Sequence, residues 1–166
     1  MVAISPPPYR IYLLRHAEAG WARPGERDFD RALSANGFAE AEIVADIASD
    51  RGYRPDLVIS STAVRCRQTA DAIRRVMDPD VEFRFVDELY NASLPVYIEI
   101  LQSQRGANAI MLIGHNPVME QTLEALIGHE ALCKALPNGY PTAGLAIVDA
   151  PSSPGLAWTL KELLTE

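Results

Sequence analysis

The sequence predicts an α/β fold: a three-layer α/β/α sandwich with a mostly parallel sheet and an antiparallel hairpin at the sheet edge. Two observations predict it. Strand-like and helix-like segments alternate along the chain, which is typical of helices packed on both faces of a parallel sheet. Three of the strand-like segments, residues 10–14, 57–60 and 109–113, are nearly continuous apolar runs. Such runs indicate strands that are buried on both faces.

Three further strands are predicted at residues 81–86, 145–148 and 158–160. The last two are joined by Pro151-Ser152-Ser153-Pro154-Gly155, whose composition is typical of a turn. Two short strands separated by a turn predict a hairpin, and we place it at the edge of the sheet.

Four helices are predicted between these strands. Each has a helical start or stop signal, such as a serine N-cap, a proline in the first turn or a terminal glycine. Apolar side chains at helical spacing are assigned to the core. The helices are expected from after Ser34 to Gly52, over about residues 62–77, from near Ser93 to before Gly106, and from Asn116-Pro117 to Gly128.

The length and composition predict one globular domain over residues 9–166, preceded by a flexible leader at residues 1–8 that contains three consecutive prolines. The chain has 166 residues, of which 48% are hydrophobic and 22% charged, with a net charge of -7. An acidic chain without a basic run is not expected to bind nucleic acid. No stretch approaches the roughly 20 apolar residues of a membrane span, so no membrane partner is expected.

The two cysteines, Cys66 and Cys133, lie in no metal-binding spacing, and no cluster of Asp, Glu and His demands a metal. We therefore expect no metal and no cofactor. Two reduced thiols and the lack of a signal peptide favour a cytoplasmic location.

Cationic and imidazole side chains follow the three buried strands. Arg15 and His16 end the first, Arg65 follows the second, and His115 ends the third. Ligands bind at the carboxyl ends of strands in open α/β sheets. Guanidinium groups suit phosphate oxygens, so the sequence predicts a phosphate site. The long charged loop over residues 17–33 follows His16 directly and is expected to cover this site.

These segments resemble the motifs of the histidine phosphatase, or phosphoglycerate mutase-like, superfamily. Leu14-Arg15-His16-Ala17-Glu18-Ala19 resembles its RHG signature, with Ala17 in place of the usual glycine. Residues 60–70 resemble the motif SSPxxRAxQTA, and Asp30-Arg31-Ala32-Leu33-Ser34-Ala35-Asn36-Gly37 resembles DRPLTxxG. Gly114-His115-Asn116 matches the third motif. The chain is short, with only residues 91–108 before the His115 strand, which resembles the SixA-type branch of phosphohistidine phosphatases.

The resemblance implies a phosphatase in which His16 is the catalytic nucleophile and forms a phosphohistidine that water hydrolyses. Arg15 and Arg65 are expected to bind phosphate oxygens, and His115 to donate another hydrogen bond, as a cation once phosphate is bound. His16 must be neutral to attack, and the two arginines disfavour its protonation. A hydrogen bond from one ring nitrogen to a backbone carbonyl is expected to fix its tautomer.

The proton donor is less well defined by the sequence. The resemblance points to a carboxyl group after the strand predicted at residues 81–86, where Asp87 and Glu88 are adjacent. We place Glu88 first because glutamate is the usual residue type, while spacing to Tyr90 favours Asp87. Three other charged residues, Glu18, Arg23 and Arg31, are expected either to contact substrate or to form salt bridges within the loop. His129 is expected at the surface or in a cap, and Cys66 in the core.

Three functions remain open from the sequence. The first is a phosphatase of phosphohistidine in a signalling protein, such as a His-containing phosphotransfer domain. The second is a phosphatase of small phosphomonoesters, and the third is a phosphate-binding regulatory module without turnover. Retention of His16, His115 and both arginines argues against the third, because binding alone needs no nucleophile.

Overall fold

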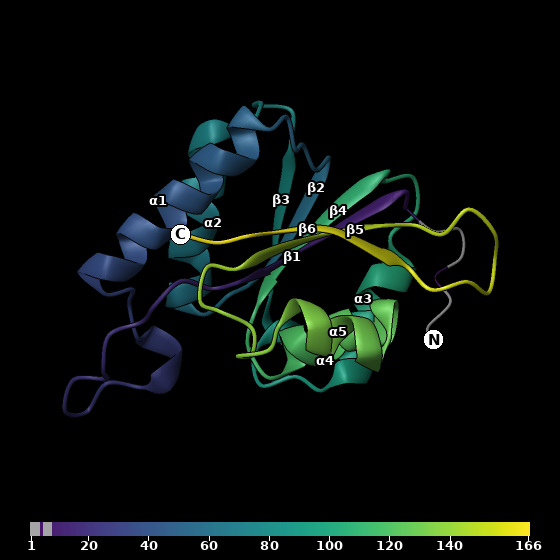
Figure 1. The fold of residues 1–166 in the computed structure, drawn as a ribbon. Coiled ribbons are helices and arrows are strands. Elements are labelled where there is room, and N and C mark those ends of the chain that lie inside the picture. The colour runs from purple at the N-terminus through teal and green to yellow at the C-terminus, as the bar shows by residue number, and fades with distance from the viewer. Residues whose placement is uncertain (1–3, 5–7) are drawn as a thin grey trace.

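The structure is a computed structural model that describes Ile4 and residues 8–166 (Figure 1). Of the predicted leader over residues 1–8, six residues (1–3 and 5–7) lie outside the described part. Ile4 is buried in the core, at 5% exposure. The division into a leader and one domain over residues 9–166 stays a prediction.

One six-stranded sheet forms the centre of the described chain, in the order β3-β2-β4-β1-β5-β6. The pairs β1–β4, β2–β4 and β2–β3 are parallel, while β1–β5 and β5–β6 are antiparallel. This arrangement confirms the mostly parallel sheet and the edge hairpin. The strands are β1 (Arg10–Arg15), β2 (Leu57–Ser61), β3 (Glu82–Val86), β4 (Ala109–Gly114), β5 (Leu145–Asp149) and β6 (Thr159–Leu164).

Helices cover both faces of the sheet, which confirms the sandwich (Figure 1). Alternate residues of a strand point to opposite faces. Accordingly, Tyr12 and Leu14 of β1 pack into one core with α1 (Ala35–Asp50) and α2 (Val64–Val76). Ile11 and Leu13 pack into a second core, whose helices are α3 (Leu94–Ser103), α4 (Val118–Ile127) and α5 (His129–Ala135).

Two elements differ from the sequence prediction. The sequence predicts that the last helix ends at Gly128, so helix α5 is not among the predicted elements. Gly128 does end α4, with a φ of +89°, but a short helix begins directly after it and buries Leu132. Strand β6 extends to Leu164 instead of residue 160. It is a partly exposed edge strand that contains Lys161 and Glu162, so it lacks the apolar pattern of a central strand.

The order of the strands brings the predicted site residues together. β1 and β4 are adjacent and parallel, and Arg15 pairs with Gly114 in their register. β2 lies on the other side of β4 and leads into α2. The carboxyl ends of these three strands therefore meet at one edge of the sheet, which is where an open α/β sheet binds ligands.

Candidate active site

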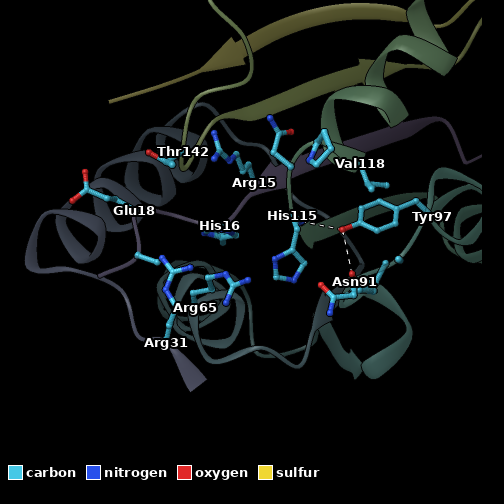
Figure 2. A pocket seen from close by; sticks show the side chains of 15 residues that line it. Arg15, His16, Glu18, Arg31, Arg65, Asn91, Tyr97, His115, Val118 and Thr142 are labelled. Atoms are coloured by element: carbon cyan, nitrogen blue, oxygen red, sulfur yellow. Dashed lines mark hydrogen bonds between the residues drawn. The ribbon is translucent and has the colours of Figure 1, made fainter. Parts of the chain in front are cut away.

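A cavity of about 630 Å³ lies at this edge (Figure 2). Such a volume is in the usual range for small-ligand sites. The cavity is lined by residues from the ends of β1 and β4, from α2, from the loop after β1 and from the segment after β3. The lining residues are Arg15, His16, Glu18, Ala19, Arg31, Arg65, Leu89, Asn91, Ala92, Tyr97, His115, Asn116, Pro117, Val118 and Thr142.

His16 is held as a neutral imidazole with one nitrogen free. Its Nδ1 lies 2.7 Å from the carbonyl oxygen of Ala17, so Nδ1 carries the proton and donates it to that carbonyl. Nε2 is left with its lone pair. Burial lowers the pKa of His16 to about 3, with the charges of Arg65 and Arg15 acting in the same direction. The backbone carbonyl predicted to fix the His16 tautomer is therefore that of Ala17. Burial lowers the pKa of His16 more than the charges of the two arginines do.

Arg15 brings a partly buried positive charge to the cavity. Its Nη1 donates to the backbone carbonyl of Tyr140 at 2.6 Å. Its Nε is buried and has no hydrogen-bond partner among the described residues. A buried donor on a charged group is costly when it is unpaired. This orphaned donor is consistent with a site built for an anion.

Arg65 is the second cation, and its side chain is only 8% exposed. Nη1 donates to the backbone carbonyl of Asp28 at 2.8 Å, and Nη2 donates to the Asp28 carboxylate at 3.1 Å. The same carboxylate accepts from Tyr90 Oη at 2.7 Å and from Arg31 Nη1 at 2.9 Å. Hydrogen bonds from Tyr90 and Arg31, followed by the charge of Arg65, lower the pKa of Asp28 below its usual range. Asp28 therefore joins three separate segments around Arg65.

His115 faces His16 across the cavity, with ring centroids 5.4 Å apart (Figure 2). Its backbone N–H donates to the hydroxyl of Tyr97 at 2.9 Å, and its Nε2 lies 2.9 Å from Ser61 Oγ. Burial, followed by the charge of Arg65, lowers the pKa of His115 to about 4. The ring is neutral at pH 7 in the unliganded protein; the cation expected with bound phosphate stays a prediction.

The loop over residues 17–33 borders the cavity through Glu18, Ala19 and Arg31. Glu40 of α1 is buried, and its carboxylate accepts from the backbone N–H of Glu18 at 3.3 Å and from Thr142 Oγ1 at 2.9 Å. Burial raises the pKa of Glu40. Gly37 allows a close approach, because a Cβ there would overlap the backbone carbonyl of Glu18. These contacts attach the start of the loop to α1.

The structure brings Arg15, His16, Arg65 and His115 to one cavity, together with Glu18 and Arg31. The other sequence candidates lie elsewhere. Glu88 is exposed on the 3₁₀ helix η2 (Asp87–Leu89), and neither it nor Asp87 lines the cavity. Asp87 accepts a hydrogen bond from Thr62 at 2.5 Å. Arg23 is exposed outside the cavity, and His129 is exposed at the start of α5. Glu88 as proton donor stays a prediction.

Sequence reasoning missed four residues that support the site. Asp28 accepts from Arg65, and Tyr90 donates to Asp28. Tyr97 accepts from the backbone N–H of His115, and Ser61 contacts the His115 ring. The helical spacing of Tyr97 predicts a core position, and the residue is indeed buried, but its hydroxyl also accepts a hydrogen bond from His115. The tyrosine hydroxyl was the available signal, since a buried hydroxyl needs a hydrogen-bond partner.

In chemical terms, three guanidinium groups (Arg15, Arg31 and Arg65) and two neutral imidazoles line one cavity, in a protein of net charge -7. Within the described residues, no three His, Cys, Asp or Glu side chains are grouped so as to hold a metal ion. No helix in the described part of the chain is long and apolar enough to cross a membrane. The fold and the site together define an α/β protein whose cavity, at the carboxyl ends of the strands, is lined by arginine and histidine side chains.

Comparisons with known proteins agree with this class. The model of the histidine phosphatase superfamily (branch 1) matches residues 11–97, and the chain belongs to this superfamily. An uncharacterised chloroplastic protein of Arabidopsis thaliana is 33% identical over 93% of this chain and 77% of its own length.

Two solved structures share the fold. One is a protein of Agrobacterium tumefaciens provisionally named phosphohistidine phosphatase SixA. It is 52% identical with a TM-score of 0.89, over 96% of this chain and 99% of that one. The other is the protein histidine phosphatase SixA in complex with tungstate. It is 19% identical with a TM-score of 0.76, over 94% of this chain and 96% of that one. The second shows similarity of fold alone.

Proposed function

We propose that the protein is a phosphatase that needs no metal, and that it removes the phosphoryl group from phosphohistidine in a signalling protein. The observation that carries the catalytic part is the state of His16. Its Nδ1 proton is committed to the Ala17 carbonyl, so the Nε2 lone pair is available in a cavity that also holds Arg15 and Arg65. A neutral, oriented nucleophile beside fixed positive charge is what phosphoryl transfer requires.

In the first step, Nε2 of His16 attacks the phosphorus atom in line with the leaving atom. The N–P bond to His16 forms, the bond to the leaving atom breaks, and that atom takes the electron pair. Arg15, Arg65 and the ring of His115 stabilise the negative charge on the phosphoryl oxygens. The positive charge that develops on the His16 ring is stabilised by its hydrogen bond to Ala17.

In the second step, water attacks the phosphorus of the phosphohistidine. The N–P bond breaks, Nε2 recovers its lone pair, and the water proton passes to solvent or to the released phosphate. A phosphohistidine substrate has a nitrogen leaving group that needs little help from an acid. This matches a cavity whose lining includes neither Asp87 nor Glu88.

The substrate assignment is supported by the Agrobacterium tumefaciens protein, which is 52% identical over nearly the whole chain. The short segment between β3 and β4 is consistent with it, because only η2, α3 and their flanking turns are present there to cover the cavity. A protein-bound phosphohistidine needs such access. Both cysteines are free thiols, which fits the proposed cytoplasmic location.

The volume of the cavity supports a second candidate, the hydrolysis of small phosphomonoesters, because about 630 Å³ accommodates a small phosphorylated metabolite. A competition assay separates the two substrates. The protein is given a phosphorylated His-containing phosphotransfer domain together with a panel of sugar phosphates, and phosphate release from each is followed. We expect a higher kcat/KM for the phosphodomain; equal or better turnover of a small metabolite assigns the second function instead.

A further inference from the structure

The inner edge of the His115 ring rests on two buried side chains that do not line the cavity. Nε2 lies 2.9 Å from Ser61 Oγ and 3.5 Å from Cys66 Sγ. Ser61 is the last residue of β2, Cys66 lies in the first turn of α2, and both are fully buried. A side chain that touches a cavity residue from behind cannot bind substrate, but it can decide how that residue presents its own hydrogen-bonding groups.

The direction of the hydrogen bond between Ser61 and His115 follows from the needs of the serine. Ser61 Oγ already accepts from the backbone N–H of Ala63 at 3.2 Å. Its hydroxyl proton also needs an acceptor, since the residue is buried. Two side-chain acceptors are in reach of that proton: Nε2 of His115 at 2.9 Å, and the sulfur of Cys66, which also contacts Ser61. Sulfur is the weaker acceptor, so the imidazole nitrogen is the better partner. Ser61 is therefore satisfied when it donates to Nε2, which then carries no proton.

The neighbouring thiol is compatible with this direction. Burial raises the pKa of Cys66 to about 12, so Cys66 stays protonated and presents an S–H to the same nitrogen. Nε2 thus faces two protonated groups as an acceptor. A neutral imidazole has one N–H, and it must then reside on Nδ1.

We propose that Ser61 is a positioning residue that holds His115 in the Nδ1–H tautomer, so that the neutral ring donates Nδ1–H to a phosphoryl oxygen in the cavity. This inference rests on the proposed phosphatase function and assigns His115 a single task within it. Both histidines carry their proton on Nδ1, but they present different ring nitrogens to the phosphoryl group. His16 presents the lone pair of Nε2 to phosphorus, and His115 presents the N–H of Nδ1 to oxygen.

Two consequences follow for the reaction. His115 stabilises the charge on the phosphoryl group without taking up a proton, so the cation expected from the sequence is not needed. A neutral imidazole N–H is also too weak an acid to protonate the leaving atom, which excludes His115 as the general acid.

The test is nuclear magnetic resonance of the ¹⁵N-labelled histidine side chains in the full chain at pH 7, without ligand. We expect His115 to show a protonated Nδ1 and an unprotonated Nε2. Ser61→Ala should shift the signal toward the Nε2–H tautomer, and Ser61→Thr should restore it. An Nε2–H tautomer or an imidazolium in the wild-type protein overturns the proposal, as does an unchanged tautomer in Ser61→Ala.

Two matched variants act as controls. Ser60→Ala removes a neighbouring buried hydroxyl that donates to the backbone carbonyl of Ser61 and not to His115. Cys66→Ala removes the thiol and leaves the serine. Both should keep the wild-type tautomer, and a shift in Cys66→Ala as large as that in Ser61→Ala overturns the assignment to Ser61.

Kinetics with an aryl phosphate provide a second readout. We expect Ser61→Ala to lower kcat about tenfold, which corresponds to the loss of one oriented hydrogen bond to charge, and Ser61→Thr to recover most of it. The two proposals fail in different ways. Absence of phosphate release by the wild-type protein defeats the proposed function, whereas full activity with an Nε2–H ring defeats only the role of Ser61.

Discussion

The two halves of the cavity are held by different means. His16 and His115 directly follow the adjacent parallel strands β1 and β4. The backbone N–H of His16 donates to Gly114 at 3.0 Å, and its carbonyl accepts from the N–H of Ala143 at 3.2 Å. Arg65 stands at the start of a helix, and its guanidinium is held from the opposite side by Asp28. The Asp28 side chain is 51% exposed, on a loop, whereas that of Arg65 is 8% exposed.

This difference in support separates two tasks of the site, which are the alignment of the nucleophile and the binding of the phosphoryl group. The nucleophile must be aligned with phosphorus to within a fraction of an ångström, and buried strands provide that rigidity. The arginine side can be reinforced or loosened by a loop without displacing His16. We therefore expect changes at the strand ends to affect the chemical step, and changes at Asp28 to affect mainly the binding of the phosphoryl group.

The largest effect is expected from His16→Ala. Removal of the nucleophile should lower the release of phosphate from an aryl phosphate by about 10³-fold or more, because the covalent route is lost. Far-ultraviolet circular dichroism should show an unchanged fold. The matched control is His129→Ala, since His129 is an exposed imidazole outside the cavity. Wild-type activity in His16→Ala contradicts the assignment of the nucleophile.

Asp28→Asn tests the part of the cavity around Arg65, which the loop residue Asp28 holds. The amide keeps the shape of the side chain but loses the charge shared by Arg65, Arg31 and Tyr90, and we expect kcat/KM to fall about tenfold, mostly through KM. Asp30→Asn is the control. Asp30 lies with Asp28 in the 3₁₀ helix η1 (Asp28–Asp30), but it pairs with exposed Arg27 and not with Arg65. A higher kcat/KM in Asp28→Asn than in the wild type means that Asp28 competes with phosphate for Arg65, which reverses its proposed role.

The contrast between the halves also explains what the sequence predicted. Arg15, His16 and His115 follow apolar strand runs, and strands of a parallel sheet deliver their ends to one edge, so their meeting follows from local pattern and topology. Asp28 lies in a loop among other charges, and nothing in its local sequence indicates that it contacts Arg65, 37 positions away. Ser61 and Tyr97 act through hydroxyl groups in elements whose pattern indicates only burial. Contacts of this kind depend on tertiary packing.

Stability at acid pH provides a third test, which concerns the two histidines at the strand ends, His16 and His115. The pKa of His16 falls from 6.5 to about 3 and that of His115 from 6.5 to about 4 on folding. Below pH 6.5 these two histidines become protonated in the unfolded chain but remain neutral in the folded protein. The free energy of unfolding should therefore decrease as the pH falls from 6.5 toward 4, by up to about 1.4 kcal/mol per pH unit for each histidine.

The measurement is urea unfolding of the wild-type protein and of His16→Asn at pH 7 and pH 5. Asparagine does not titrate, so the variant should lose less stability between the two pH values than the wild type does. Taking this difference removes the contribution of other groups, such as Glu40, whose raised pKa acts in the opposite direction. An equal loss in both proteins shows that His16 protonates at its ordinary pKa.

The smallest effect is expected from Glu88→Gln. The carboxyl group of Glu88 is exposed and outside the cavity lining, so its replacement should change phosphate release from a phosphohistidine or an aryl phosphate by less than about twofold, whereas loss of a working general acid costs about 10²- to 10⁴-fold. Asp87→Asn is the natural companion, because its hydrogen bond to Thr62 gives it a structural reason to matter. An alkyl phosphate, with its poor leaving group, is the most demanding substrate. If Glu88→Gln loses 10²-fold or more of its activity with the alkyl phosphate only, Glu88 is the proton donor. The segment after β3 must then move toward the strand ends during the reaction, so this side of the cavity takes part in the chemistry as well as in binding.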